Sequence, residues 1–322
     1  MQNWEGIFDI DSKQTFEKWA LKIYAFQYEN NKVYRQFCTH IGRKQPKSIS
    51  EIPFLPISAF KHHQVRTEGL DTLTTFKSSG TSKSIRSVHQ VQNEEIYKRS
   101  FFKHFESHFG KLSDFTILAL LPNYIDQGES SLIYMVDHLI KATKNENSGF
   151  VLNDVQSIAS RISNAKKEKR KVLLFGVSYA LIDLAEMKMD LSEVIIIETG
   201  GMKGKRKEWT KEELHQYLFD ELNQPEIHSE YGMTELFSQG YSKKDGLFQL
   251  PKWMDCKIRA TNDPFEWLPD GKTGGINVID LANVFSCSFI ATDDLGQTFN
   301  KELKLMGRID HSDIRGCNLL VE

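Results

Sequence analysis

The chain has 322 residues, of which 40% are hydrophobic and 26% are charged, and its formal net charge is −2. This composition is typical of a globular protein and excludes disordered, collagen-like and coiled-coil chains. Lys and Arg together number 41 against 43 Asp and Glu, which argues against a dedicated nucleic-acid binder because such proteins usually carry a basic excess. The longest uncharged apolar runs are too short for an integral membrane segment, which needs about 20 residues.

The N-terminus and the cysteines indicate the compartment. Residues 1–11 contain three acidic side chains and no apolar core, so they do not predict a secretory signal. The four cysteines are widely spaced and form no CxxC pair, which argues against a zinc site or a disulfide framework. We therefore expect a reduced, cytoplasmic protein.

The N-terminal third is expected to be mainly helical. Apolar residues at helical spacing from Phe16 to Phe37 predict one long helix, with Asp11 and Ser12 as caps and Gly42 at its end. Three prolines around 46–56 exclude a continuous helix there. Asn93 is expected to cap a second helix that runs to about 110.

The middle of the chain has the clearest organisation. A strand at 115–121 and helices at 129–141 and 153–169 precede an alternating series of strands and helices: 172–177, 179–189, 194–198, 210–222 and 226–231. This alternation predicts parallel βαβ units and an α/β fold. Ligands of such sheets bind outside the carboxyl ends of the strands, from which the loops 199–206 and 232–236 depart. After Tyr241 the strands shorten, and 276–281 and 286–291 are expected to pair antiparallel.

Three loops carry residues suited to chemistry. The first runs from Lys77 to Lys83, where hydroxyls, a glycine and flanking lysines suit a phosphate. It lacks the GxxxxGK[ST] spacing of a Walker A loop, and the alternative is a flexible polar surface turn.

The second loop is Tyr231-Gly232-Met233-Thr234-Glu235. Its ring is able to stack on a base, its threonine to reach a phosphate and its acid to bind Mg²⁺. The alternative is a strand-to-loop turn with a solvated glutamate.

The third is Thr292-Asp293-Asp294-Leu295-Gly296, followed by the segment 306–310. An acid after a strand is able to accept hydrogen bonds from ribose hydroxyls. The alternative is a hairpin turn.

Taken together and in order, these segments resemble the adenylate-forming superfamily of acyl- and aryl-CoA ligases. SSGTS looks like its phosphate loop, YGMTE like its adenine and magnesium motif, TDDLG like its ribose-binding motif and GRID like the hinge that ends the large domain. Within the superfamily the chain is most similar to the LuxE-type acyl-protein synthetases, the fatty-acid-activating subunits of bacterial fatty acid reductase complexes. The segments IPFLPISAFK, ETGGMKGKRKEW and RGCNLLVE carry that likeness.

The resemblance implies a reaction and a set of site residues. A carboxylate attacks the α-phosphate of ATP, pyrophosphate leaves and an acyl-adenylate stays bound, a reaction that depends mostly on positioning and charge neutralisation. The residues implied to bind the nucleotide are Ser78, Ser79, Gly80, Thr81, Ser82, Lys83, Gly200, Gly201, Tyr231, Gly232, Met233, Thr234, Asp294 and Arg308. Thr234 is also implied in catalysis, and Glu235 in binding Mg²⁺.

The sequence departs from the superfamily pattern in two places. It ends twelve residues after Asp310, where most members continue into a mobile domain with a catalytic lysine. We therefore expect a substitute cation from the basic segment after the two glycines, namely Lys203, Lys205 and Arg206, for which the alternative is a solvated basic loop. The phosphate loop also lacks its second glycine.

Cys317 lies near the C-terminus in RGCN. The acyl acceptor of LuxE-type proteins is a cysteine in this region, so the resemblance implies that Cys317 receives the acyl group as a thioester, with Arg315 favouring the thiolate. The alternative is an inert thiol in a docked tail. Cys38, Cys256 and Cys287 have apolar neighbours and are expected in the core.

The sequence thus predicts an adenylate-forming large domain at 1–310, with a helical part at about 1–50 and a β-rich part at about 242–310, and a C-terminal tail at 311–322. The expected function is ATP- and Mg²⁺-dependent activation of a carboxylic acid, in particular a fatty acid, with transfer to Cys317 and then to an acyl-accepting protein such as a reductase or carrier protein. The alternatives are a CoA or carrier-protein ligase that uses a separate C-terminal partner, and a non-catalytic nucleotide- or acyl-binding module.

The pair His104 and His108 and the basic run 166–171 are expected on helix surfaces.

Overall fold

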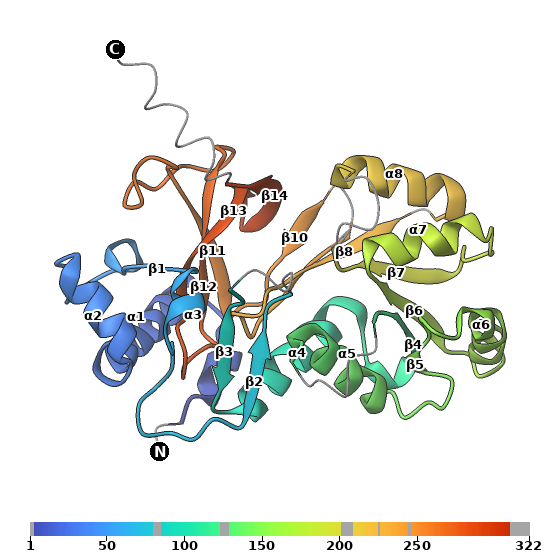
Figure 1. Cartoon of the computed structure of the whole chain (residues 1–322), viewed down its shortest axis with the longest axis horizontal. Coiled ribbons are helices and arrows are strands. Elements are labelled where there is room, and N and C mark those ends of the chain that lie inside the picture. Colours follow the sequence, from blue (N-terminus) through green and yellow to red (C-terminus); the bar gives the residue numbers. More distant parts are fainter. Residues whose placement is uncertain are drawn as a thin grey trace, which may run out of the picture. The chain divides into compact units, whose positions relative to one another are not determined.

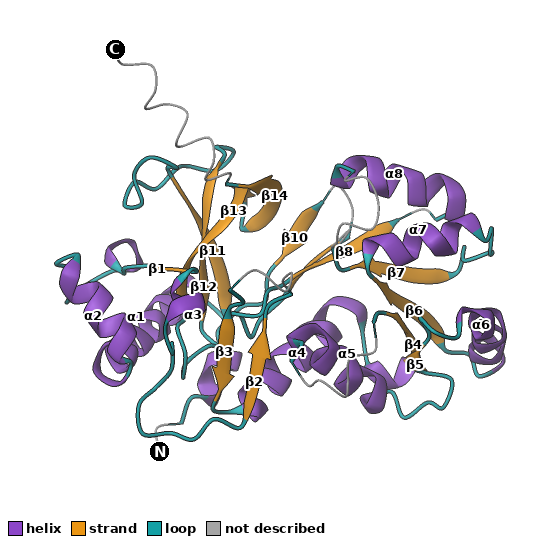
Figure 2. Cartoon of the chain, in the orientation of Figure 1, coloured by secondary structure: helices purple, strands orange, loops and turns teal. Residues whose placement is uncertain are grey.

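The computed structural model describes residues 3–79, 85–122, 129–200, 209–224, 226–243 and 246–309. The chain forms two compact units. Unit 1 joins Met1–Glu68 with Lys252–Glu322, and unit 2 is Gly69–Pro251. The N-terminal helices and the late strands therefore share unit 1, and the alternating strands and helices form unit 2 (Figures 1 and 2).

The long N-terminal helix of unit 1 is broken into two. Helix α1 covers Lys13–Asn30 and is capped by Ser12, as predicted, while α2 covers Lys32–His40. Asn31 lies between them in an extended conformation, accepts a hydrogen bond from the Tyr34 N–H and donates one to the Ser286 carbonyl. The prediction of one helix was wrong because this buried asparagine caps the second helix.

The other elements of unit 1 form an antiparallel sheet and short helical turns. The strand order is β11-β12-β13-β14, and β1 pairs parallel with β13. The elements are η1 (Glu5–Asp9), η2 (Ile49–Glu51), β1 (Leu55–Pro56), α3 (Ala59–His62), β11 (Met254–Arg259), β12 (Gly274–Asp280), β13 (Phe289–Phe299) and β14 (Glu302–Arg308). The expected antiparallel pair is present as β12 and β13, with Val278 opposite Ile290. The proline-rich segment contains no continuous helix, as predicted.

Unit 2 contains the parallel sheet that the sequence predicts. Its order is β10-β9-β8-β7-β6-β4-β5, with neighbours parallel from β8 to β5 and antiparallel from β8 to β10. The strands are β4 (Phe115–Leu120), β5 (Gly149–Phe150), β6 (Lys171–Gly176), β7 (Val194–Glu198), β8 (Ile227–Tyr231), β9 (Gly240–Ser242) and β10 (Leu247–Gln249). A separate hairpin pairs β2 (Thr74–Lys77) with β3 (Val88–Val91).

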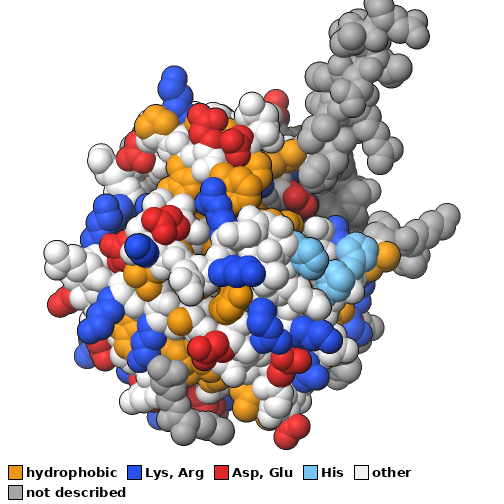
Figure 3. All heavy atoms as spheres, turned by 90° about the vertical axis from the view of Figure 1, so that its left-hand side faces the viewer, with side chains coloured by type: hydrophobic (Ala, Val, Ile, Leu, Met, Phe, Trp, Pro, Cys, Tyr) orange, Lys and Arg blue, Asp and Glu red, His pale blue; other side chains and the backbone are white. Residues whose placement is uncertain are grey.

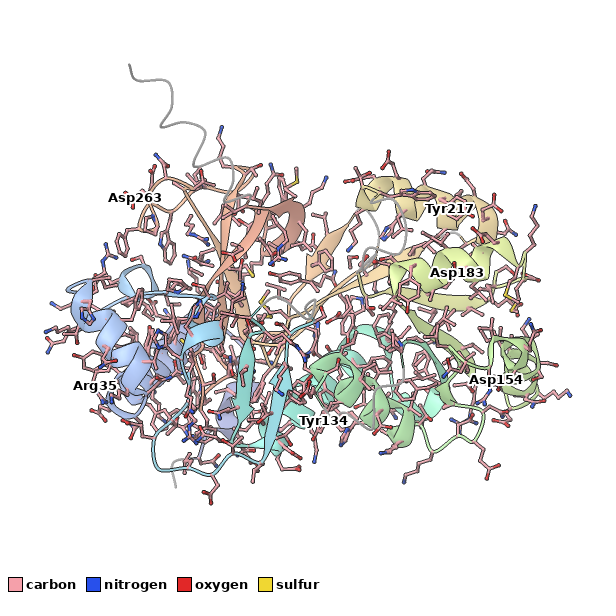
Figure 4. All side chains as sticks on the ribbon, in the orientation of Figure 1. Arg35, Tyr134, Asp154, Asp183, Tyr217 and Asp263 are labelled. Atoms are coloured by element: carbon pink, nitrogen blue, oxygen red, sulfur yellow. The ribbon has the colours of Figure 1, made fainter. Side chains whose placement is uncertain are left out.

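Helices cover both faces of this sheet. Figure 1 shows α7 and α8 on one face and α4 and α5 on the other. The helical elements are α4 (Glu94–Phe109), η3 (Leu112–Asp114), α5 (Ser131–Ala142), η5 (Val155–Ser157), α6 (Ile158–Lys167), α7 (Ser178–Glu186) and α8 (Lys211–Leu222). The predicted caps are confirmed at Asn93, and at Thr210 with Glu213 as a capping box. Tyr134 of α5, which Figure 4 labels, lies on the helix next to α4. Its hydroxyl donates to the Glu94 carboxylate 2.9 Å away and so ties α5 to α4.

Surface character agrees with the composition. On the face that Figure 3 shows, the Lys and Arg side chains of the described residues lie interspersed with Asp and Glu. The helices within the described ranges are all too short or too polar to span a bilayer.

Candidate active site

The carboxyl ends of β7 and β8 lie side by side in unit 2. Glu198, the last residue of β7, is the register partner of Ser229, which lies two residues before the end of β8. Gly200 follows β7 with a positive φ of 77°, a conformation that favours glycine. The two predicted nucleotide-binding loops therefore depart from neighbouring strands, as the parallel topology predicts.

The loop Tyr231–Glu235 begins on a buried aromatic ring. Tyr231 is 6% exposed, and its ring centroid lies 5.9 Å from that of Phe248. At Gly232, an added Cβ atom would clash with Oε1 of Glu230, so a larger residue would displace that carboxyl group. Burial raises the pKa of Glu230 to about 8, against the opposing effect of Lys211, so this half-buried group is mostly neutral at pH 7.

A contact from β3 holds the next part of this loop. The Nδ1 atom of His89 lies 2.8 Å from the carbonyl oxygen of Thr234. His89 itself is fully buried and belongs to the hairpin that carries the predicted phosphate loop. The hairpin and the Thr234 segment are thereby joined within one unit.

The two ends of the phosphate loop are closed by backbone and side-chain contacts. The Ser78 N–H donates to the Ser87 carbonyl at 3.0 Å, and the Ser87 N–H donates to Oγ of Ser78 at 2.9 Å. Arg86 donates to the carbonyls of Ser78 and Lys77 and also to the Glu129 carboxylate. Lys77 pairs with the other oxygen of Glu129. Glu129 thus forms ion pairs with both cations at the ends of the loop, Lys77 and Arg86. The sequence alone did not reveal this role.

A buried carboxylate, Glu198, lies where β7 ends beside β8. Glu198 is 1% exposed and accepts hydrogen bonds from Ser178 at 2.5 Å and from the Gly200 N–H at 2.6 Å. Burial alone raises the pKa of Glu198, but His215, the Lys211 ammonium and the hydrogen bonds outweigh it and lower the pKa to about 2. The group is therefore ionised at any physiological pH.

The predicted ribose-binding residues lie in unit 1. Nε of Arg308 lies 3.3 Å from Oδ1 of Asp294, and the two residues face each other across β13 and β14. Asp294 lies within strand β13 and its backbone N–H donates to Oγ1 of Thr292 at 3.1 Å. The hairpin-turn alternative is wrong, because the segment continues as a strand.

Several predicted residues lie outside the described part of the chain. These are Gly80, Thr81, Ser82, Lys83, Gly201, Lys203, Lys205, Arg206 and Cys317. Their roles remain predictions. Ser78, Ser79, Tyr231, Gly232, Met233, Thr234 and Glu235 all lie in unit 2 together with Gly200, while Asp294 and Arg308 lie in unit 1.

Other candidates of the sequence have structural roles. Cys38, Cys256 and Cys287 are buried free thiols, as predicted, and burial raises the pKa of Cys38 to about 12. His104 is only 4% exposed and stacks on Tyr241. The expectation that it lies on a helix surface was wrong, because that side of α4 packs on the sheet.

The donor set also bears on magnesium. Within the described ranges, no group of three or more His, Cys, Asp or Glu residues is arranged to hold a metal ion. Mg²⁺ that arrives with a nucleotide takes most of its ligands from phosphates and water and one or two from carboxylates. Glu235, a buried carboxylate at the sheet edge, fits that role.

Comparison with known sequences adds a family and a relative. The sequence profile of the acyl-protein synthetase family LuxE matches residues 8–322. The long-chain-fatty-acid–luciferin-component ligase of Vibrio harveyi is 23% identical over 345 residues, which cover 96% of this chain and 88% of that protein.

Comparison with solved structures confirms the predicted fold class. ATP-bound MatB from Rhodopseudomonas palustris superimposes with a TM-score of 0.55 at 18% identity, over 74% of this chain and 48% of that one. A 2-hydroxyisobutyryl-CoA ligase with bound 2-HIB-AMP and CoA gives a TM-score of 0.67 at 12% identity, over 92% and 68%. The chain spans about half the length of the MatB structure. At these identities the likeness establishes the fold of the adenylate-forming enzymes.

Proposed function

We propose that this chain, which belongs to the acyl-protein synthetase family LuxE, uses ATP to activate a fatty acid and transfers the acyl group to a protein thiol. In the first step a carboxylate oxygen of the acid attacks the α-phosphorus of ATP, and pyrophosphate leaves from the same phosphorus. In the second step a thiolate attacks the acyl carbon, and AMP leaves. The acyl thioester then passes to an acceptor protein.

The observation that carries the proposal is the contact between Nδ1 of His89 and the carbonyl oxygen of Thr234. It joins the hairpin of the proposed phosphate loop to the proposed base-binding turn inside one unit. A nucleotide needs these two parts at a fixed separation, because its base and its phosphates are bound at the same time. Such preorganisation lowers the ordering cost of binding.

Roles for the described residues of unit 2 follow from this arrangement. Tyr231 stacks on adenine, and Gly200 lets the backbone approach the base. Ser78 and Ser79, with the loop that follows, surround the leaving phosphates, and Thr234 contacts the phosphate that is attacked. Charge development at phosphorus is stabilised by such fixed donors.

Three further roles extend the proposal. Asp294 accepts hydrogen bonds from the ribose hydroxyls and Arg308 holds Asp294 in place. Glu235 binds Mg²⁺, which supplies charge neutralisation on the phosphates. Lys203, Lys205 or Arg206 supplies the cation for the carboxylate and the α-phosphate.

The transfer step is assigned to Cys317, with Arg315 favouring its thiolate. The name of the Vibrio harveyi relative pairs a long-chain fatty acid with a luciferin component, which supports the acid class. We assign the final acceptor to a protein such as a reductase or carrier protein. The three described cysteines are poor candidates, because burial raises the pKa of each thiol. The cytoplasmic location remains a prediction from cysteine usage.

A second function is a ligase that transfers the acyl group to CoA or to a carrier protein. The likeness to a CoA ligase in complex with CoA favours it. On this reading a separate C-terminal partner supplies the catalytic lysine, and Cys317 is dispensable. A non-catalytic nucleotide-binding module is the third reading.

Intact mass spectrometry distinguishes these functions. The wild type, Cys317→Ser and Cys256→Ser are incubated with ATP, Mg²⁺ and a mixture of fatty and aryl acids. We expect one acyl adduct on the wild type and on Cys256→Ser, none on Cys317→Ser, and release of the adduct by neutral hydroxylamine. An adduct that persists in Cys317→Ser contradicts the assignment of the thiol. ATP–pyrophosphate exchange without any adduct supports the CoA ligase, and no exchange supports the binding module.

A further inference from the structure

Glu198 is a buried, ionised carboxylate for which the proposed reaction has no direct use. It ends β7 at a relative exposure of 1% and lies next to the proposed adenine site. Burying an ionised carboxylate carries a large desolvation cost, and a well-packed apolar residue of similar volume often stabilises a fold equally well. The position of this charge therefore calls for an explanation beyond packing.

The hydrogen bonds of Glu198 join segments that the sequence separates. Oε1 accepts from Oγ of Ser178 at the start of α7 and from the N–H of Gly200. Oε2 lies 3.4 Å from Oγ of Ser229 on β8 and 3.4 Å from Nζ of Lys211 at the start of α8. One carboxylate thus connects four elements at the ligand-binding edge of the sheet.

Two of these partners adjoin the segments that are proposed to bind the base. The Gly200 N–H bond holds a turn of positive φ at the end of β7. Ser229 lies two residues before Tyr231, the proposed stacking ring. Because both bonds end on the same side chain, the spacing between the Gly200 backbone and the strand that carries Tyr231 depends on Glu198.

We infer that Glu198 is a positioning residue for nucleotide binding, which sets the gap between Gly200 and Tyr231 that receives the adenine base. This inference rests on the proposed function, because it takes the base to lie between these two segments. Glu198 does not touch the nucleotide in this arrangement. It acts through the Gly200 N–H and through Ser229.

The inference predicts which part of the nucleotide is affected. A loosened base site lowers the affinity for AMP and for ATP by the same factor, because both nucleotides carry the base. A loosened phosphate loop lowers the affinity for ATP more than the affinity for AMP. The comparison of the two nucleotides therefore separates Glu198 from Arg86 and Glu129, which close the phosphate loop.

The test uses Glu198→Gln, with Glu198→Ala as the more severe change. Glutamine keeps the size of the side chain, but it removes the charge and presents an N–H₂ group to Lys211, which has no acceptor. Isothermal calorimetry measures the affinity of the full chain for AMP and for ATP. The control is Ile162→Ala, which removes a buried side chain of α6 and lowers the unfolding temperature without touching the Glu198 network.

We expect Glu198→Gln to lower the affinity for AMP and the affinity for ATP by an equal factor of about five to fifty. This is the range for a lost buried hydrogen-bond partner. In ATP–pyrophosphate exchange with the carboxylic acid substrate present, we expect the substitution to raise the KM for ATP and to leave kcat unchanged. Glu198→Ala shows a larger loss of affinity if it folds. Ile162→Ala, with a comparable loss of thermal stability, binds both nucleotides as the wild type does.

Three results overturn the inference. One is a folded Glu198→Gln protein with unchanged AMP affinity, and another is an equal loss of affinity in Ile162→Ala. The third is a wild type that binds neither nucleotide, which contradicts the proposed function as well. A wild type that binds ATP but supports no exchange contradicts acid activation alone, and calorimetry then still decides the role of Glu198.

Discussion

The Arg86 guanidinium lies 2.8 Å from the Glu129 carboxylate through its Nη1 atom and also donates to the backbone carbonyls of Ser78 and Lys77. One planar cation therefore links the end of β2, the approach to β3 and Glu129, which lies two residues before the start of α5. The segment that leaves Ser78 and returns at Arg86 begins and ends at this bridge. A guanidinium suits the position, because its donors form a rigid fork and a lysine ammonium does not.

Replacing Arg86 by lysine should weaken ATP binding while it keeps the charge. The ammonium is unable to reach both carbonyls and Glu129 at once, so the ends of the loop separate more easily. We expect the KM for ATP to rise by roughly tenfold and the affinity for AMP to change little. ATP–pyrophosphate exchange and calorimetry with both nucleotides measure these effects.

Arg161→Lys is the matched control for this substitution. Arg161 also forms a fork, to Oγ of Ser157 and the Asn147 carbonyl, both at 3.0 Å, but it lies on α6. Its replacement should leave the KM for ATP unchanged. An equal rise in both variants would mean that Arg86 acts through general stability alone.

His104 should make the fold sensitive to acid. Burial, with His108 nearby, lowers the pKa of His104 from 6.5 to about 3. The unfolded chain takes up a proton below its ordinary pKa and the folded chain does not, so stability falls as the pH drops from about 6.5 towards 3. The slope is up to about 1.4 kcal/mol per pH unit.

Urea unfolding of the wild type and of His104→Gln between pH 7 and pH 4 measures this contribution. At pH 7 the variant should be less stable, because it loses the stacking contact with Tyr241. That deficit should shrink as the pH falls, because glutamine does not titrate. Two parallel stability curves would contradict the assignment.

Glu230 should have the opposite pH dependence. Burial raises its pKa from 4.5 to about 8, so between these values the folded chain holds a proton that the unfolded chain has released. Stability therefore falls as the pH rises through this window, by at most about 1.4 kcal/mol per pH unit. Glu230→Gln removes this loss and should be more stable than the wild type at pH 8 but not at pH 4.5.

Glu94→Gln is the control for Glu230. Hydrogen bonds from Thr74 and Tyr134 and the Lys98 charge outweigh burial and lower the pKa of Glu94. Its contribution is present above the ordinary pKa of a glutamate and is lost as the pH falls. This variant should therefore be less stable than the wild type at pH 8, the reverse of Glu230→Gln. The same sign for both would refute the account.

Local signals in the sequence predicted much of unit 2. The buried strand 194–198 and the Thr210–Glu213 capping box depend on neighbouring residues, and both are where the sequence placed them. The break at Asn31 was missed because its side chain bonds Ser286, 255 positions away. Apolar spacing on both sides of Asn31 continues the helical pattern, so no local signal marks the change of direction.

The same distinction applies to the candidate site. The residues proposed to touch ATP form short motifs and are recognisable from the sequence. The residues that hold them come from other segments. His89 contacts Thr234 at a sequence separation of 145 residues, and Glu129 contacts Arg86 at a separation of 43. Glu198 was visible only as an acid between a buried strand and two glycines. Such supporting contacts depend on the tertiary fold, and a single sequence does not specify them.

The ribose assignment yields a prediction that pairs a protein change with a ligand change. If Asp294 accepts hydrogen bonds from the ribose hydroxyls, Asp294→Ala and the use of 2′- or 3′-deoxy-ATP remove the same contact. The wild type should lose about tenfold in kcat/KM on at least one of the deoxy nucleotides, the value of a hydrogen bond to a charged group. Asp294→Ala should lose a similar amount on ATP and little more on that deoxy nucleotide.

Asp270→Ala provides the comparison within unit 1. Asp270 is a carboxylate that accepts from Oγ1 of Thr298 at 2.8 Å and from the Asn300 N–H at 3.1 Å, and it is not part of the Asp294–Arg308 pair. This variant should discriminate between ATP and the deoxy nucleotide as the wild type does. The measurement is the initial rate of ATP–pyrophosphate exchange for each protein with each nucleotide. If the losses in Asp294→Ala and in the deoxy nucleotides multiply instead of overlapping, Asp294 does not contact the ribose, and its pairing with Arg308 serves only the β13–β14 strand pair.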